Sequence, residues 1–205
     1  MKPQVDSSTY RFEDYVSKEL FLSYYNQIKM ISKINPRNML NIGVGGKVIE
    51  KLIPDSIECF GLDHDIELKP TVQASIEELP FKDNTFDLVT CFEVLEHLPF
   101  EKFEFLLKEL SRVSRKDVLL SLPFANNKFK LSIFLPVIHD ITFQYLLPKF
   151  YRKHEFDGIH YWEIGKRNFP MIKITDIISG VFDIEERYTL NDFTYHTFFY
   201  LHKRK

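Results

Sequence analysis

Residues 41–46 read Asn-Ile-Gly-Val-Gly-Gly, and Asp63, 20 positions after Gly43, ends the run Gly-Leu-Asp. The apolar residues around both runs predict a strand, a glycine turn, a short helix and a second strand that ends in one acid. In a βαβ unit of the Rossmann type, the glycines let the backbone approach a ligand, and the acid accepts hydrogen bonds from ribose hydroxyls. The pair of runs therefore predicts a site for an adenosine-containing ligand.

The glycine spacing disfavours two common nucleotide sites. A dinucleotide fingerprint needs a small residue at its sixth position, where this chain has Val48. A phosphate loop needs glycine at position 41 and Ser or Thr at position 48, and the chain has Asn41 and Val48 there. The alternative that stays open is that Gly43 and Gly45 only make a tight turn.

Two further runs complete a set of motifs. Residues 74–81 read Ala-Ser-Ile-Glu-Glu-Leu-Pro-Phe, and residues 86–98 read Phe-Asp-Leu-Val-Thr-Cys-Phe-Glu-Val-Leu-Glu-His-Leu. In this order, residues 38–123 resemble the class I S-adenosylmethionine-dependent methyltransferases, especially their small bacterial and archaeal subgroup. The resemblance implies an α/β, Rossmann-like, doubly wound fold. It has a mostly parallel seven-stranded sheet, a C-terminal antiparallel hairpin and helices on both faces.

The same resemblance implies S-adenosylmethionine as cofactor, with S-adenosylhomocysteine as product, and a set of binding residues. These residues are Asn41, Gly43, Val44, Gly45, Lys47, Asp63, His64, Ser75, Ile76 and Cys91. The chain departs from the family pattern at three of them, because the family usually has an acid at positions 41 and 75 and a glycine at position 47. We expect Asn41 to bind the amino-acid end of the cofactor without a charge, Lys47 to pair with its carboxylate, and Ser75 to contact the adenine amino group.

Candidates for a catalytic base are His97, His160 and Glu163, with Glu93 as a fourth. Glu93 and His97 are four positions apart, so on a helical turn they share one face. His97 matches the histidine of the family's Leu-Glu-His segment, and the alternative for it is a capping or packing role. His160 offers a titratable imidazole close in sequence to the Glu163 carboxylate. His64 either stacks on adenine or is an exposed loop histidine.

Composition excludes several classes of protein. The chain has 205 residues and a formal net charge of −2, which gives no overall attraction to nucleic acid. Its two cysteines have no zinc-ligand spacing, so we expect buried free thiols and no metal. Residues 1–10 are polar and lack the apolar core of a secretory signal, and no segment has the length and apolarity of a transmembrane helix. We expect a cytoplasmic protein.

The periodicity predicts one domain over residues 1–205, with residues 1–36 as an N-terminal helical cap. Apolar residues recur every three or four positions from residue 10 to residue 34, which indicates an amphipathic helix that Pro36 ends. Strands and helices then alternate to residue 122. A helix over residues 173–179, closed by Gly180, precedes two strands over residues 182–188 and 195–202.

Residues 124–169 form a lid or insertion in this interpretation. The segment has seven Lys and Arg against four Asp and Glu, so it is locally basic, and it is rich in aromatic residues. It follows the fifth core strand, beside the crevice where ligands of open α/β sheets bind. A core-covering lid, an anionic-substrate pocket, and a surface for a membrane or a partner subunit all stay open.

Together these features predict an S-adenosylmethionine-dependent methyltransferase that acts on a small molecule such as a sugar, a lipid-linked intermediate or another metabolite. We expect no nucleic-acid partner, at most weak contact with a membrane surface, and a monomer or homodimer. The alternatives are a non-catalytic cofactor-binding or scaffold protein of the same fold and, disfavoured by Val48, an NAD-dependent oxidoreductase.

Overall fold

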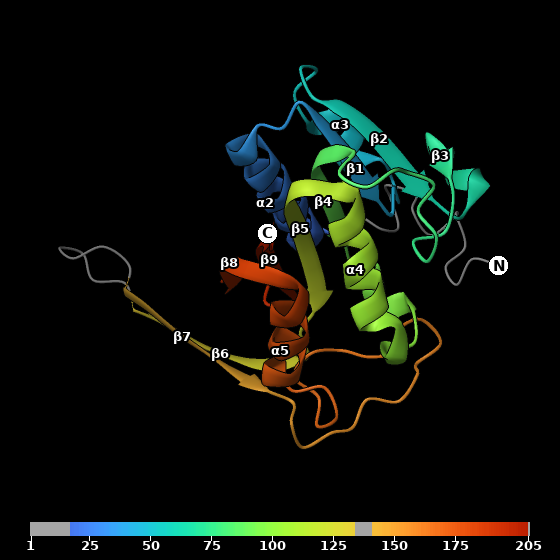
Figure 1. Ribbon diagram of the computed structural model, residues 1–205. Coiled ribbons are helices and arrows are strands. Elements are labelled where there is room, and N and C mark those ends of the chain that lie inside the picture. Colours follow the sequence, from blue (N-terminus) through green and yellow to red (C-terminus); the bar gives the residue numbers. More distant parts are fainter. Residues whose placement is uncertain (1–16, 134–140, 205) are drawn as a thin grey trace.

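The computed structural model of the protein describes residues 17–133 and 141–204 (Figure 1). Its strands are β1 (Asn38–Ile42), β2 (Glu58–Asp63), β3 (Val72–Gln73), β4 (Phe86–Phe92), β5 (Ser114–Pro123), β6 (Asn126–Ile133), β7 (Ile141–Pro148), β8 (Phe182–Thr189) and β9 (His196–Lys203). Its α-helices are α2 (Lys18–Ile34), α3 (Val48–Leu52), α4 (Phe103–Val113) and α5 (Met171–Val181). Short 3₁₀ turns are η2 (Ile66–Leu68), η3 (Leu95–His97) and η4 (Phe100–Lys102).

Seven of the strands form one sheet in the order β3-β2-β1-β4-β5-β9-β8. The first five are parallel to their neighbours, and β9 runs antiparallel to both β5 and β8. This arrangement confirms the Rossmann-like, mostly parallel fold and the C-terminal antiparallel hairpin. The central strands have short apolar sequences because both faces of the sheet are covered.

Alternate residues of the central strands pack into two separate cores. Met39, Leu88 and Leu119 face the core that α2 and α3 cover. Leu40 and Val89, one position later, face the core that α4 and α5 cover. Side chains of a strand alternate between faces, so the two clusters confirm that helices lie on both sides of the sheet.

The N-terminal helix ends where the sequence indicates. The last residue of α2 is Ile34, and Asn35 adopts a left-handed conformation with φ of 50° as the cap before Pro36. At the other end, the Ser17 side chain accepts a hydrogen bond from the N–H of Leu20. The part of the predicted helix before residue 17 lies outside the described residues.

The segment after β5 divides into two different parts. Strands β6 and β7 pair as an antiparallel hairpin that projects from the domain body, an element that the sequence analysis missed (Figure 1). The following stretch, up to α5, returns along the end of the domain toward which β5 points (Figure 1). Residues 134–140, part of the apolar run in the predicted insertion, lie outside the described residues. Among the described residues, no helix combines the length and apolarity needed to cross a bilayer.

The expectation that Gly180 closes the last helix is wrong, because α5 continues to Val181. Gly180 lies within the helix, and a Cβ atom added there would meet nothing within 4 Å. Gly43 is the opposite case: its φ is +80°, and an added Cβ would lie 2.4 Å from Cγ2 of Val94.

We expect Gly43→Ala to lower the free energy of unfolding by about 1–3 kcal/mol, because it combines a left-handed backbone with a steric clash. Gly180→Ala, the matched control, should raise it by about 0.5–1 kcal/mol through higher helix propensity. Urea titrations followed by circular dichroism measure both changes. A Gly43→Ala variant as stable as the parent protein would contradict this account of the turn.

Candidate functional site

The carboxyl ends of the parallel strands meet along one edge of the sheet. Ile42 of β1 pairs with Leu62 of β2 and with Cys91 of β4, and Phe92 of β4 pairs with Ser121 of β5. The residues that follow these positions therefore leave the sheet side by side. This register brings the glycine turn, the acid after β2 and the 93–97 segment to the edge where open α/β sheets bind ligands.

The glycine turn after β1 is fixed by its neighbours. Gly43 and Gly45 have φ of 80° and 46°, and the N–H of Gly43 donates to the carbonyl of Leu62 at 2.9 Å. The N–H of Val44 donates to Oδ2 of Asp63 at 3.1 Å. The acid at the end of β2 is thus joined directly to the turn.

Asp63 is 8% exposed, and its second oxygen, Oδ1, accepts from the N–H of Asp65 at 3.0 Å. The imidazole of His64 lies 3.3 Å from the same oxygen and is exposed. Each carboxylate oxygen has two lone pairs, so both retain capacity for a further donor. The Asp63 carboxylate is therefore held in a fixed position at the edge of the sheet and can still accept a hydrogen bond from a ligand.

Behind the turn, Asn41 is buried with a carboxyl group that the sequence analysis missed. Oδ1 of Asn41 accepts a hydrogen bond from the Thr90 hydroxyl at 2.9 Å. Burial raises the pKa of Glu50, while the charge of Lys47 and a hydrogen bond from the Asn41 side chain oppose that rise. Glu50 of α3 therefore supplies an acid beside position 41 from another element, which sequence spacing alone does not reveal.

Lys47 makes contacts within the protein. It has φ of 58° at the start of α3, and its ammonium group donates to the carbonyl of Lys69 and lies 3.9 Å from Glu50. Ser75 is also engaged, because its hydroxyl accepts from the N–H of Glu77 at 3.1 Å. Ile76 and Cys91 are buried in the core beneath this edge.

The Glu93–His97 segment is not the helical turn that the sequence analysis expected. Glu93 has φ of 52°, and only the short 3₁₀ turn η3 follows it. A left-handed residue cannot continue a helix, so Glu93 and His97 do not share a helical face. Oε2 of Glu93 lies 3.3 Å from Nε2 of His196, whereas His97 stacks edge-on against His160 with ring centres 5.0 Å apart.

Burial shifts the pKa values of both glutamates and of the histidine in this segment. Burial raises the pKa values of Glu93 and Glu96, and the charge of Glu93 raises that of Glu96 further. Burial and the charge of His160 lower the pKa of His97 to about 4, so its imidazole is neutral at neutral pH. Shifted titratable groups gathered at a ligand-binding edge are a frequent mark of functional sites.

The stretch from 157 to 164 is hydrogen-bonded to this edge. The N–H of Tyr161 donates to the carbonyl of Glu96 at 2.8 Å, and the N–H of Ile164 donates to that of Pro123 at 3.0 Å. Trp162 is fully buried and packs edge-on against Phe100 and Phe103, and its indole N–H donates to the carbonyl of Leu98 at 3.2 Å. These contacts place His160 beside His97, although 63 positions separate them.

Glu163 lies behind His160 and is ionised. Burial would raise its pKa, but hydrogen bonds from His160 and from Tyr195 at 2.8 Å, with the charge of Lys166, hold it at about 2. Nδ1 of His160 is 3.4 Å from Oε1 of Glu163. A carboxylate that orients an imidazole is a familiar arrangement in acid–base sites. Tyr195 comes from the loop before β9 and carried no sequence signal.

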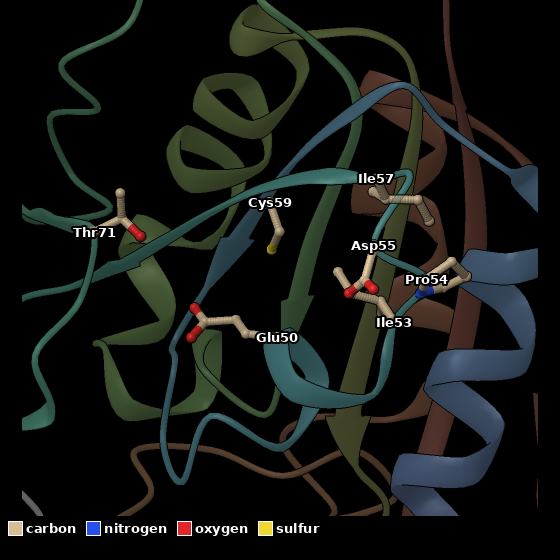
Figure 2. Close-up of a pocket in the computed structure, with 7 residues that line it drawn as sticks. All are labelled: Glu50, Ile53, Pro54, Asp55, Ile57, Cys59 and Thr71. Atoms are coloured by element: carbon tan, nitrogen blue, oxygen red, sulfur yellow. The ribbon is translucent and has the colours of Figure 1, made fainter.

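An open hollow of about 350 Å³ lies on the flank of α3 (Figure 2). Its lining residues are Glu50, Ile53, Pro54, Asp55, Ile57, Cys59 and Thr71. Cys59 is the second residue of β2, so the hollow lies toward the opposite end of that strand from Asp63. Burial and the charge of Glu50 raise the pKa of the Cys59 thiol to about 12, which leaves it unreactive at neutral pH.

The chain is similar to known proteins in sequence and in fold. Residues 40–122 match the family model described as a methyltransferase domain. A stretch of 40 residues is 55% identical to the uncharacterized protein MJ0638 of Methanocaldococcus jannaschii. That stretch covers 20% of this chain and only 16% of the relative, so the match spans a small part of that protein.

Solved structures share the fold over most of the chain. The PH0226 protein from Pyrococcus horikoshii has a TM-score of 0.58 at 13% identity, with 96% of each chain covered. Magnesium protoporphyrin IX methyltransferase from Synechocystis, with bound SAM, has a TM-score of 0.58 at 13% identity, with 91% of this chain and 80% of that chain covered. The 1,6-didemethyltoxoflavin-N1-methyltransferase of Burkholderia thailandensis, with 1,6-didemethyltoxoflavin and S-adenosylhomocysteine bound, has a TM-score of 0.61 at 11% identity, with 97% and 85% covered.

We expect Asn41→Asp to lower the free energy of unfolding by about 1–3 kcal/mol, because it places a second buried carboxyl group beside Glu50. The double variant Asn41→Asp/Glu50→Gln exchanges acid and amide between the two positions and should recover most of that loss. Thermal and urea unfolding of the parent protein, both single variants and the double variant complete the cycle. Additive effects of the two changes would show that the side chains do not interact.

Proposed function

We propose that the chain is a class I S-adenosylmethionine-dependent methyltransferase that transfers a methyl group from this cofactor to a small molecule, and the methyltransferase-domain match over residues 40–122 supports the proposal. The observation that carries the proposal is the link between the glycine turn and Asp63, whose carboxylate accepts the Val44 N–H at the end of β2. This is where the superfamily's fold holds the ribose and the amino-acid part of the cofactor.

The proposed cofactor site follows the edge of the sheet. The backbone of Gly43, Val44 and Gly45 contacts the amino-acid part, and Asp63 accepts hydrogen bonds from the ribose hydroxyls. His64 is exposed next to Asp63 and is available to stack on the adenine ring, and the 75–76 segment contacts its edge. Two structural neighbours with the same fold hold SAM or S-adenosylhomocysteine, which supports this cofactor.

Asn41 and Lys47 take indirect roles in this proposal. Asn41 is buried behind the turn and bonded to Thr90, so it stiffens the strand end together with Glu50. Lys47 is already paired with Glu50 and with the Lys69 carbonyl. At these two positions the chain differs from the family in the side chains that support the turn. The backbone N–H groups proposed to face the ligand are unchanged.

The proposed acceptor side consists of His97, His160 and Glu163. In methyl transfer, a lone pair of the acceptor attacks the methyl carbon in line with the C–S bond. The electron pair of that bond stays on sulfur, which becomes a neutral thioether. Positioning of donor and acceptor supplies much of the rate. His160, oriented by the ionised Glu163, is placed to take a proton from an acceptor.

The proposed class of acceptor is a small molecule that binds beside residues 157–164. That stretch is fixed to the sheet edge by Trp162 and by backbone bonds to Glu96 and Pro123. The structural neighbour from Burkholderia thailandensis, with 1,6-didemethyltoxoflavin bound, supports an acceptor of this size. Transfer of labelled methyl from the cofactor into a cell extract separates an enzyme from a binding protein that performs no chemistry.

We expect S-adenosylhomocysteine to raise the melting temperature by roughly 5–10 °C. At about 100 times the dissociation constant, binding adds about 2.7 kcal/mol, and each kcal/mol is worth roughly 2–4 °C in a chain of this length. NAD at the same concentration should give no shift, because the turn lacks the dinucleotide spacing. Equal shifts from both ligands, or none from either, would refute the proposed cofactor.

Asp63→Asn should weaken S-adenosylhomocysteine binding by at least about tenfold, because it removes charge-assisted hydrogen bonds to ribose worth about 1.5–3 kcal/mol each. Asp55→Asn, in the hollow beside α3, is the matched control and should bind as the parent does. Isothermal titration of the three proteins tests this. Parent-like affinity of Asp63→Asn would place the ribose elsewhere.

A further inference from the structure

Two imidazoles and one carboxyl group converge where β4 ends. Glu96, His97 and His160 each offer one ligand atom, and these atoms lie within 4.8 Å of one another. The ligand atoms of a tetrahedral zinc ion lie about 3.4 Å apart, since each is about 2.1 Å from the metal. Displacements of the side-chain atoms by about an ångström therefore bring the three groups within bonding distance of one ion.

The hydrogen bonds of both histidines leave the same ring nitrogen free. Nδ1 of His97 lies 3.1 Å from the carbonyl of Ile159, which only accepts, so Nδ1 carries the proton and Nε2 has the lone pair. Nδ1 of His160 lies 3.4 Å from Oε1 of Glu163, a carboxyl oxygen that accepts hydrogen bonds, which again places the proton on Nδ1. Metal-binding histidines are held in this way, with the second nitrogen donating to a carbonyl or a carboxylate.

Glu96 has no cation beside it, in the described part of the chain, that would stabilise a buried carboxylate. It is 0% exposed, and apart from the neighbouring Glu93 carboxyl group and its own backbone its side-chain oxygens have no hydrogen-bond partner among the described residues. The carboxyl group of Glu93 is adjacent, which adds a second acid to the same pocket without neutralising the first. Buried carboxylates are normally paired, hydrogen-bonded or bound to a metal, and a cation at this position would satisfy both oxygens.

A second group of possible ligands, Asp157, His160 and Glu163, is already engaged. Asp157 accepts the N–H groups of Ile159 and His160, and Glu163 accepts from Tyr195 and faces Lys166. Only the Glu96 group combines a carboxyl that lacks a cationic partner with two oriented imidazoles. The two groups differ, therefore, in how much of their donor capacity is left for an ion.

We propose that Glu96, His97 and His160 bind one divalent first-row transition-metal ion such as zinc or manganese. Two imidazole nitrogens and one carboxylate suit this class of ion and leave a coordination position open. The two cysteines lack zinc-ligand spacing, which led to the expectation of no metal, but this set uses no cysteine.

The position of the ion gives it a role in the reaction, on the condition that the proposed methyl transfer is correct. Val94, between Glu93 and Glu96, packs directly against Gly43 of the cofactor turn. An acceptor hydroxyl at the open position would have its pKa lowered by the metal. With the ion bound, His160 would be a ligand instead of the base, and the hydroxyl would release its proton to solvent. Its oxygen then attacks the methyl carbon, the C–S electron pair stays on sulfur, and a methyl ether forms. The acceptor class is thus a hydroxyl compound.

The test begins with binding, not turnover. The full chain is freed of metal with a chelator, dialysed and titrated with zinc and with manganese in a calorimeter, with the melting temperature as second readout. We expect saturable binding of one ion per chain and a rise in melting temperature. His160→Gln and Glu96→Gln should each weaken it by at least about 100-fold. His202→Gln is the control and should not change it, because His202 pairs with Asp117 near the start of β5, at the opposite end of β9 from His196.

Three results would contradict the proposed metal site. No saturable binding of either ion, binding of magnesium alone, or affinity unchanged in both Glu96→Gln and His160→Gln would each do so. His160→Gln keeps the proposal testable if Glu96→Gln does not fold. S-adenosylhomocysteine binding, measured on the metal-free protein, distinguishes the two proposals: cofactor binding without metal binding rejects only the ion, and the reverse rejects only the cofactor.

Discussion

The docking of residues 159–164 against the ends of β4 and β5 determines what the sheet edge can do. Backbone bonds from Tyr161 to Glu96 and from Ile164 to Pro123 join two parts of the chain that are far apart in sequence. The buried indole of Trp162 fixes this contact against the start of α4. Without it, His160 would not meet His97, and the glycine turn would face no residues from the 157–164 stretch.

Buried acids shape the rest of the site. Glu50 stands behind the glycine turn, and Glu93 with Glu96 lies after β4. Placing carboxyl groups out of water is costly unless each finds a partner, so such groups persist where they serve a function. An amide at position 41 fits this setting, because an acid there would place a second carboxyl group beside that of Glu50.

The sheet could be predicted from the sequence because its order follows local patterns. Short apolar runs gave the strands, the Gly43 turn and Asp63 gave the first βαβ unit, and the terminal hairpin was expected and is confirmed. The site depended on contacts between distant residues. The meeting of Tyr195 with Glu163, the acid supplied by Glu50 and the left-handed Glu93 have no local signature. The β6–β7 hairpin was missed because its basic and aromatic residues were attributed to a lid.

A crystal structure of the protein with S-adenosylhomocysteine tests the central claim most directly. The account predicts the ribose hydroxyls on Asp63, the amino-acid part over the Gly43 turn, and the sulfur facing His97 and His160 across an open space. A ligand bound in the hollow beside α3, or a ribose away from Asp63, would contradict it.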